Sequence, residues 1–464
     1  MQDDQIIPAG GPLSFGARVR NNARATLRLA LPAMGSRAGM LLLLTVDTVM
    51  VGHIGQDQLA YQIVGVTIQS VMTLIAIGFL QGTLVLISQA YGAREYPFCG
   101  EVWRVALIIA ATIGIVSLVV SFFGEPFFSS LGQSREMAEG AGAVLLQYGW
   151  GMPATMLYVA CAYLLEGLQR PRVAMVIMLS SVFVNVGLNS VVLYVFDGGA
   201  TEAVAMTSVT RWLNVAVIFF YITRVMHDRA EFGIRMPRLP TRESALAVWR
   251  YVRRALKLGL PMGATQGAET TAFAALTLIA ATLGEAAAAA HGVTMQLVQV
   301  VFMLAIGMSA ATSVRAGFAV GARDRWGVAW AGWTGASLIL LIMLPFGVLF
   351  FLFPLFSGMI FTTAPETLAI AAITIQIAAF MLIFDSVMTL MIGALRGAGD
   401  VIVPMSLHIL SMWGIMVPAA WVLGIHMNYG VPGLFIGMFI GIGIAAIVAT
   451  TRFAFVSRRE IARA

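Results

Sequence analysis

The sequence predicts an all-α integral membrane protein with twelve transmembrane helices, arranged as two six-helix bundles that are related by an internal repeat. Two observations support this prediction, an apolar composition and a long repeat. Hydrophobic residues make up 59% of the 464 residues, charged residues make up 11%, and the mean hydropathy is +0.88. Such a chain has too little polar surface to cover a water-soluble protein of this size, so we expect lipid around it.

The repeat relates residues 31–95 to residues 260–324 at one constant offset, without a gap. The matched pairs include prolines, glycines and one polar tetrapeptide. They are Pro32 with Pro261, Gly55 with Gly284, Ala60 with Ala289, Gly78 with Gly307, and Gly92-Ala93-Arg94-Glu95 with Gly321-Ala322-Arg323-Asp324. A register held over this length indicates two halves of one fold.

Twelve apolar runs are long enough to cross the hydrocarbon core, which takes about 20 helical residues. A backbone in lipid must pair its polar groups internally, and runs of this length exceed the tilted strands of a barrel, so we expect helices. The predicted spans are 30–51, 61–86, 102–123, 140–165, 173–196, 202–224, 258–282, 287–312, 328–352, 368–395, 402–424 and 433–455.

The longest hydrophilic stretch, His227 to Lys257, separates span six from span seven. Its arginine-rich run from Trp249 to Arg254 is either a short amphipathic helix at the membrane surface or part of a solvated linker. We therefore expect five parts. They are a cytoplasmic N-terminal tail (1–29), an N-lobe (30–225), a cytoplasmic linker (226–257), a C-lobe (258–455) and a cytoplasmic C-terminal tail (456–464).

The basic residues predict the orientation of the spans. Of 28 lysines and arginines, only Arg135 falls in a loop assigned to the outside, and only Arg37 and Arg211 lie well inside spans. The other 25 lie in the tails, in the loops on the opposite side or at the adjoining span ends. The positive-inside rule then places both termini in the cytoplasm. The net charge of +6 reflects this topology, so we expect no nucleic-acid binding. No small-residue cleavage site follows the first apolar run, which favours a retained span.

Other function classes lack the motifs that they require. Cys99 and Cys161 are the only cysteines and have neither CxxC nor metal-ligand spacing, so we predict two inert buried thiols. The sequence contains no HExxH or GxSxG motif and no cluster of His and Asp, which argues against a membrane-embedded hydrolase or transferase.

Ionisable residues inside spans are the candidates for function, because placing each of them in a membrane costs several kcal/mol unless it is paired or hydrated. Three carboxylates qualify. Asp47 lies near the outer end of span one, Glu269 lies near the middle of span seven, and Asp385 lies well inside span ten. The repeat pairs Asp47 with Leu276 and Glu269 with Met40, so the acids do not follow the repeat.

Asp47 shares its predicted depth with three polar residues of the same lobe. Asn185 and Asn189 are four residues apart on one face of span five, and Thr207 lies at a similar depth in span six. A carboxylate, two amides and a hydroxyl suit a hard cation such as sodium, or a hydrogen-bond network around one proton. A structural polar contact between helices is the alternative.

Glu269 and Asp385 form the second candidate site, in the C-lobe. Two carboxylates in one low-dielectric cavity repel each other, so one of them tends to hold a proton near neutral pH. Such a pair can carry a proton across the membrane or exchange it for a cation. Two unrelated acids, each hydrogen-bonded to a neighbour, are the alternative.

Other polar residues in or near spans are expected to be structural. Glu166 precedes Arg170 by four residues and predicts an ion pair at a helix end. Arg37 is close enough to the inner end of its span to reach the interface, and Arg211 is expected to face the bundle interior. The histidines follow no ligand pattern, so capping or hydrogen-bonding roles are expected for them.

Several separate motifs resemble the signatures of the multidrug and toxic compound extrusion (MATE) transporters, over about residues 28–452. The first-half motifs are Leu31-Pro32, Asp47-Thr48-Val49-Met50-Val51-Gly52-His53-Ile54-Gly55 and Gly92-Ala93. The second-half motifs are Leu260-Pro261, Gln266-Gly267-Ala268-Glu269, Arg315 to Gly321, and Gly393-Ala394-Leu395-Arg396-Gly397-Ala398-Gly399-Asp400 with Pro404. The presence of both Glu269 and Asp385 is more similar to the NorM-like branch than to the DinF-like branch.

The resemblance implies an efflux antiporter of the bacterial inner membrane, not an enzyme, that expels cationic amphipathic compounds in exchange for sodium ions or protons. It also implies a monomer in membrane lipid without a cofactor beyond the coupling ion. Asp47, Asn185, Asn189 and Thr207 match the family's first-lobe cation site, which includes a candidate sodium site. Glu269 and Asp385 match its second-lobe acids.

Two departures from the family pattern bear on the choice of ion. Asn189 stands where some members carry an aspartate, and Met381 stands where NorM-like members can carry a tyrosine. Both departures remove a candidate ligand, so the sequence leaves sodium and proton coupling open. The alternative function is a lipid-linked oligosaccharide flippase of the same architecture. The phosphate of such a substrate would require a cationic cavity, whereas the buried charges here are mainly acidic.

Overall fold

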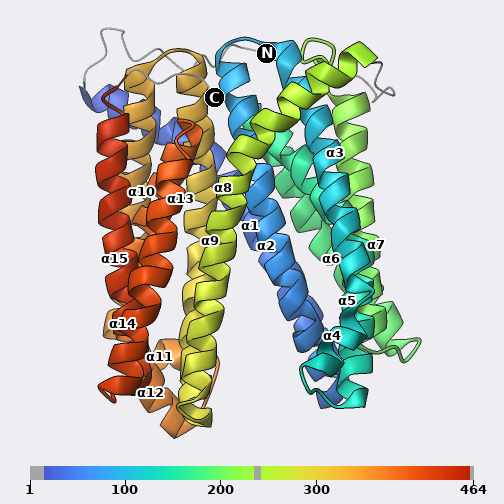
Figure 1. Cartoon of the computed structure of the whole chain (residues 1–464), viewed down its shortest axis with the longest axis vertical. Coiled ribbons are helices and arrows are strands. Elements are labelled where there is room, and N and C mark those ends of the chain that lie inside the picture. Colours follow the sequence, from blue (N-terminus) through green and yellow to red (C-terminus); the bar gives the residue numbers. More distant parts are fainter. Residues whose placement is uncertain (1–14, 235–241, 460–464) are drawn as a thin grey trace. The chain divides into compact units, whose positions relative to one another are not determined.

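The computed structural model describes residues 15–234 and 242–459 of the chain, and these residues form helices without a β-strand (Figure 1). Ten of the described helical segments are long and apolar enough to cross a membrane. The prediction of an all-helical membrane protein is therefore confirmed.

The helices begin and end as follows. The first part of the chain forms α1 (Phe15–Gly52), α2 (Gln56–Gly92), α3 (Tyr96–Ser121), α4 (Gly124–Ser130), α5 (Arg135–Gly167), α6 (Arg172–Tyr194) and α7 (Ala200–Phe220), which continues as the π-helix η1 (Tyr221–Val225). The second part forms α8 (Arg242–Ala281), α9 (Glu285–Gly321), α10 (Arg325–Leu352), α11 (Pro354–Met359), α12 (Pro365–Gly397), α13 (Ile402–Ile409), η2 (Leu410–Met416), α14 (Val417–Trp421), η3 (Val422–His426) and α15 (Gly430–Val456).

Two of the predicted spans, 140–165 and 258–282, lie in α5 and α8, which are long helices but are not among the ten. In α5 the reason is composition, because polar and weakly hydrophobic residues such as Gln147, Pro153 and Thr155 interrupt the apolar run. The helix is almost entirely buried from Tyr148 to Gly167, so most of its side chains meet protein instead of lipid. A helix in that position needs less hydrophobicity than one that faces lipid.

Several helix ends recur at the offset found in the sequence, which relates Pro32 to Pro261. The bounds of α2 and α9 match at both ends, and so do the last residues of α1 and α8 and the first residues of α3 and α10. The turns after α2 and α9 each contain an arginine in the left-handed conformation, Arg94 with φ 60° and Arg323 with φ 57°. In each turn the following N–H donates back to the helix, from Glu95 to Ala90 and from Asp324 to Ala319.

The chain packs as two compact units. The described residues of the first unit are 35–234 and 242–263, and those of the second unit are 15–34 and 264–459. These units differ from the predicted lobes because the start of α1 packs with the second unit and the start of α8 with the first. Residues 15–29, predicted as part of a tail, are helical and continue directly into the first span. The two changeovers, after Met34 and after Gly263, are also related by the repeat offset.

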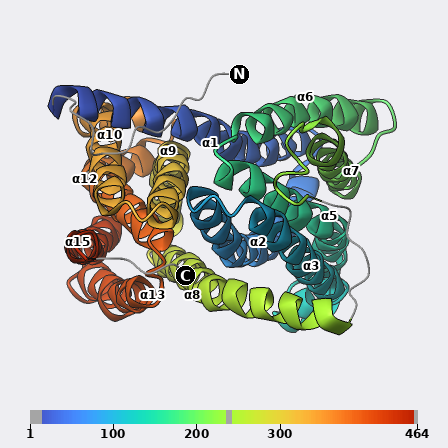
Figure 2. The same ribbon diagram turned by 90° about the horizontal axis from the view of Figure 1, so that it is seen from above.

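In the first unit α5 is the central helix and contacts α2, α3, α4 and α7 (Figure 2). The close approach of α5 to α3 depends on Gly114 of α3, because a Cβ on this residue would clash with the backbone of Pro153 in α5. In the second unit α12 contacts α9, α10, α11 and α15. Here a Cβ on Gly397 would clash with the carbonyl oxygen of Ser313. Small residues at crossing points let helix backbones approach closely in a membrane.

The ion pairs of the first unit differ from the prediction that joined Glu166 to Arg170. Glu166 instead pairs with Arg37 of α1, whose Nη2 lies 3.4 Å from both carboxylate oxygens. The Arg37 side chain is therefore paired inside the protein, with 11% of it exposed. Arg170 donates two hydrogen bonds to Asp228, in the segment after η1. These hydrogen bonds raise the pKa of Arg170, against the effect of burial. Burial alone would raise the pKa of Asp228, but the hydrogen bonds from Arg170 outweigh it and lower that pKa.

Glu166→Gln is expected to lower the free energy of unfolding of the purified protein by about 3 to 5 kcal/mol, because it leaves the Arg37 guanidinium buried without its carboxylate. Thermal unfolding in detergent measures the effect. Glu139→Gln is the matched control, because its pair with Arg135 is exposed, with 92% and 49% of the two side chains accessible, and should not change stability measurably. Equal melting temperatures for the two variants would contradict a structural role for the buried pair.

Candidate functional site

The four polar residues predicted for the first lobe lie together in the first unit. Asp47 accepts one hydrogen bond on each carboxylate oxygen, from Asn189 Nδ2 at 2.7 Å and from the Thr207 hydroxyl at 2.6 Å. Asn185 Nδ2 donates to Thr207 Oγ1 at 3.0 Å, and Asn189 Nδ2 also lies 3.4 Å from Asn185 Oδ1. The cluster therefore joins α1, α6 and α7.

All four side chains are buried, and the carboxylate of Asp47 is held by uncharged donors. Asn189 Oδ1 is buried and accepts no hydrogen bond among the described residues. An unpaired buried carbonyl oxygen is costly unless water or a cation meets it. The cluster thus offers a carboxylate and one free amide oxygen to a proton, a water molecule or a small hard cation.

Three further residues of the first unit lie around this cluster, and the sequence did not single out two of them. The Tyr148 hydroxyl of α5 is buried and interacts with the buried side-chain amide of Gln62 in α2. The Arg211 guanidinium lies over the Tyr148 ring, 5.0 Å from its centroid, and within electrostatic range of Asp47. Arg211 thus faces the interior, as predicted, and puts a fixed positive charge near the acid.

The second unit holds the other two predicted acids. Asp385 is 5% exposed in the middle of α12, and Glu269 on α8 lies within electrostatic range of it. No hydrogen bond joins the two carboxylates among the contacts described for them. Met381, one turn before Asp385, is fully buried and offers no oxygen ligand. Like charges in a low-dielectric environment favour binding of a proton or a cation at such a pair.

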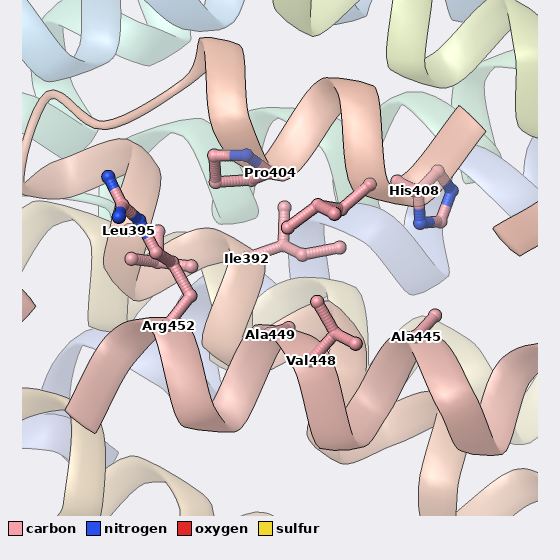
Figure 3. Close-up of a pocket in the computed structure, with 9 residues that line it drawn as sticks. Ile392, Leu395, Pro404, His408, Ala445, Val448, Ala449 and Arg452 are labelled. Carbon is pink, nitrogen blue, oxygen red and sulfur yellow. The ribbon is translucent and has the colours of Figure 1, made fainter. Parts of the chain in front are cut away.

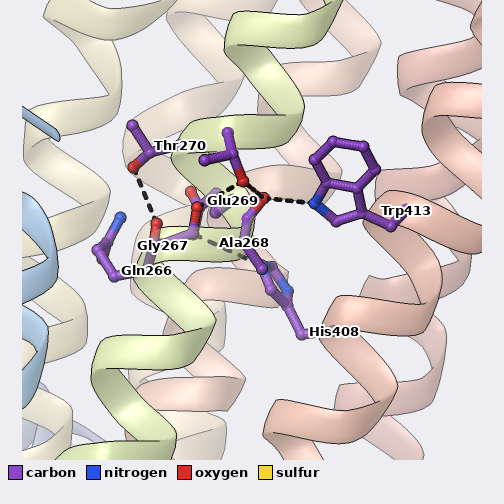
Figure 4. Close-up of polar contacts among 8 residues, drawn as sticks. Gln266, Gly267, Ala268, Glu269, Thr270, His408 and Trp413 are labelled. Atoms are coloured by element: carbon purple, nitrogen blue, oxygen red, sulfur yellow. Dashed lines mark hydrogen bonds and ion pairs between the residues drawn. The ribbon is translucent and has the colours of Figure 1, made fainter. Parts of the chain in front are cut away.

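Glu269 has a basic neighbour that the sequence did not reveal. His408 of α13 places its Nε2 3.5 Å from Glu269 Oε2, and the ring is 2% exposed (Figure 4). Next to this contact the Trp413 indole N–H donates to the carbonyl oxygen of Ala268 at 3.0 Å. The signal in the sequence was weak, because an isolated histidine in an apolar run usually packs as a structural residue and the two helices are far apart along the chain.

The segment that carries His408 and Trp413 is not a regular α-helix. Between Ile402 and His426 it contains two π-helical stretches, η2 and η3, on either side of α14. Pro418 provides a physical reason, because proline has no N–H to complete the preceding turn. Widened turns of this kind are frequent at functional sites. Glu269 therefore lies beside an irregular helical segment.

The geometry defines a helical membrane protein with a set of buried or partly buried polar residues in each unit, around Asp47 in the first and around Glu269 and Asp385 in the second. Among the described residues, no group of three or more His, Cys, Asp or Glu side chains has the arrangement of a metal centre. The chemistry available to the two sets is reversible binding of a proton or of a small cation.

The MatE family model matches the chain twice, over residues 32–191 and over residues 261–422. The two matches begin at Pro32 and Pro261, the prolines that the repeat pairs. Together they cover more than half of the chain. The chain belongs to the MatE family.

The relatives and solved structures agree with this assignment. The chain is 29% identical to the probable multidrug resistance protein NorM of Caulobacter vibrioides, over 94% of this chain and 92% of that protein. It is 29% identical to the protein of the same name from Xanthomonas axonopodis pv. citri, over 97% and 98% of the two chains. The fold is similar to that of the eukaryotic MATE transporter AtDTX14, with a TM-score of 0.85 at 18% identity, covering 95% of this chain and 98% of that one.

A mutant form of the Vibrio cholerae MATE transporter VcmN gives the same TM-score, 0.85, at 19% identity, over 95% of this chain and 98% of that one. At these identities the structures establish the fold alone. The prediction of a MATE family member similar to NorM proteins is confirmed.

Proposed function

We propose that this protein is a secondary active multidrug efflux antiporter of the bacterial inner membrane that exports cationic amphipathic compounds in exchange for protons or sodium ions. Family membership and the names of the NorM relatives support a role in multidrug efflux. The observation that supports ion exchange most directly is the buried carboxylate of Asp47, which is held by Asn189 and Thr207 instead of by a permanent ion pair.

We further propose that the fold has twelve spans in two six-helix bundles related by the repeat. Three observations support it, because each recurs at the offset that relates Pro32 to Pro261. They are the matching ends of α2 and α9, the two changeovers between the compact units and the starts of the two family matches. Both termini are proposed to lie in the cytoplasm, because the positive-inside rule assigns nearly all basic residues to that side.

The proposed mechanism follows from charge. When Asp47 or the Glu269 and Asp385 pair is ionised, the protein interior carries negative charge that favours a cationic compound. When a proton or sodium ion neutralises these acids, that attraction is lost. Exchange is coupled if the drug and the ion prefer different conformations, because a ligand shifts an equilibrium only by its difference in affinity between the two states.

The cluster around Asp47 favours the proton over sodium as the ion of the first unit. Both carboxylate oxygens already accept hydrogen bonds, and within the described part of the chain Asn189 Oδ1 is the only oxygen of the four side chains that accepts none. Sodium would need several oxygen ligands at once, whereas a proton needs only one carboxylate oxygen.

Asn189→Asp is expected to make efflux depend on sodium. It places a second carboxylate against Asp47. Such a pair keeps one proton when no cation is present, whereas a sodium ion between the two groups allows both to ionise. Transport with and without sodium chloride, at matched ionic strength, measures the effect. Asn189→Ala, which removes the amide without adding charge, should show no stimulation by sodium. The same response to sodium in Asn189→Asp and in the wild type would contradict this account of the cluster.

The experiment that tests the proposed function uses inside-out membrane vesicles in sodium-free buffer with an imposed pH gradient. A fluorescent lipophilic cation should accumulate in vesicles that contain the wild-type protein, and collapse of the gradient should release it. Accumulation that requires sodium and ignores the pH gradient would assign coupling to sodium. The absence of accumulation under both gradients would overturn the proposed function.

A further inference from the structure

His408 lies in surroundings that do not satisfy an ordinary structural histidine. The ring is 2% exposed, and neither Nδ1 nor Nε2 has a hydrogen-bond partner among the described residues. A neutral imidazole needs one acceptor for its N–H and one donor for its other nitrogen. Leaving both unpaired in a buried position is costly. The carboxylate of Glu269 makes an ionic contact with the ring, 3.5 Å from Nε2.

A pocket of the second unit extends from His408 on the side of α13, α12 and α15 (Figure 3). Its walls are apolar, formed by residues such as Ile392, Leu395 and Val448, and its polar groups are His408 and Arg452, at opposite ends. Arg452 is already paired, because its Nε donates to Asp400 at 2.7 Å. His408 thus lines the pocket and also contacts Glu269.

The charged groups around His408 show what its protonation would change. His408 faces Glu269 of α8, and Asp385 of α12 lies within electrostatic range of Glu269. Arg452 of α15 lies at the other end of the pocket and is paired with Asp400. A protonated imidazole would balance the charge of one carboxylate. A neutral imidazole would leave the two carboxylates to repel each other. Imidazole is the side chain whose charge normally changes between about pH 5 and pH 8.

We propose that His408 is the proton-exchange partner of Glu269 and sets the pH range over which the acid pair of the second unit takes up and releases its proton. In the transfer, the Nε2–H bond of the imidazolium breaks as an O–H bond forms on Glu269 Oε2. The imidazole keeps its proton on Nδ1, and a proton carried by water restores the imidazolium. This inference rests on the proposed antiport function and adds a residue of the second unit to it.

The test compares His408→Gln with the wild type in proteoliposomes, by recording the rate of efflux of a fluorescent lipophilic cation against pH in sodium-free buffer. Without the basic partner the carboxylates should keep their proton to a higher pH. The profile of His408→Gln should therefore move to higher pH, by about one pH unit, with the rate near neutral pH reduced about tenfold.

His291→Gln is the matched control, since His291 is also buried in the second unit but contacts the hydroxyl of Thr277 and no carboxylate in the contacts described. Its profile should coincide with that of the wild type. A His408→Gln profile that also coincides would overturn the role of His408 while leaving antiport intact. A wild type that transports no cation at any pH would instead overturn the proposed function.

If His408→Gln does not fold, histidine NMR of the intact protein provides an independent test. The chain has five histidines, so the ring of His408 can be assigned by elimination with single variants of the other four. Glu269→Gln should change how the NMR resonances of the His408 ring depend on pH, because it removes the negative charge beside the ring. An unchanged pH dependence would overturn the proposal.

Discussion

Asp47→Asn is expected to abolish efflux, with a loss of at least about tenfold in the rate of export of a lipophilic cation. Asparagine keeps the shape of the side chain and can still meet Asn189 and Thr207, so the three helices should pack as before. What is lost is the ability to alternate between a charged and a neutral state. The measurement is export from cells that carry the variant, together with its level in the membrane.

Asp57→Asn is the matched control for Asp47. This residue lies in the first turn of α2, outside the buried cluster, and its side chain is exposed. It should export the cation at the rate of the wild type. Normal export by Asp47→Asn at a normal membrane level would remove Asp47 from the mechanism, and the hydrogen-bonded cluster would then be a structural contact between α1, α6 and α7.

Glu269→Gln and Asp385→Asn form the second large prediction, with each variant expected to lower export at least about tenfold. The two acids influence each other through their charges, so they should act as one unit and the double variant should be little worse than either single variant. Export and drug resistance of cells measure the effect. Glu366→Gln, at the exposed first turn of α12, is the control and should behave as the wild type.

Normal resistance in cells with either single variant would exclude that acid. Losses that add fully in the double variant would show that the acids work independently. Since Glu269 also contacts His408, a loss of export in Glu269→Gln alone would point to that contact instead of to the acid pair.

The helical class and the polar cluster of the first unit could be predicted because their signals are local. Apolar runs of a spanning length predict helices, and the spacing of Asn185 and Asn189 places both amides on one helix face. Their depth in the membrane then indicated a meeting with Asp47 and Thr207. The structure places these four side chains in one hydrogen-bonded network.

Contacts between distant helices could not be predicted from one sequence. Glu166 was assigned to Arg170 because they are four residues apart, but α1 passes closer and supplies Arg37. The contact of His408 with Glu269 joins helices that are far apart along the chain, and no pattern of spacing reports such a pairing. The start of α1 packs with the second unit and the start of α8 packs with the first. An apolar pattern cannot predict this, because each helix is continuous at the residue where its packing partner changes.

The most direct test measures proton movement itself. Proteoliposomes with the purified protein are loaded with a pH-sensitive dye in sodium-free buffer, and a gradient of a lipophilic cation is imposed across the membrane. If buried acids exchange protons for the exported compound, protons should move against the flow of the cation with wild-type protein and not with Asp47→Asn. Passage of the cation at the wild-type rate without any opposing movement of protons, or of sodium when it is supplied, would contradict antiport.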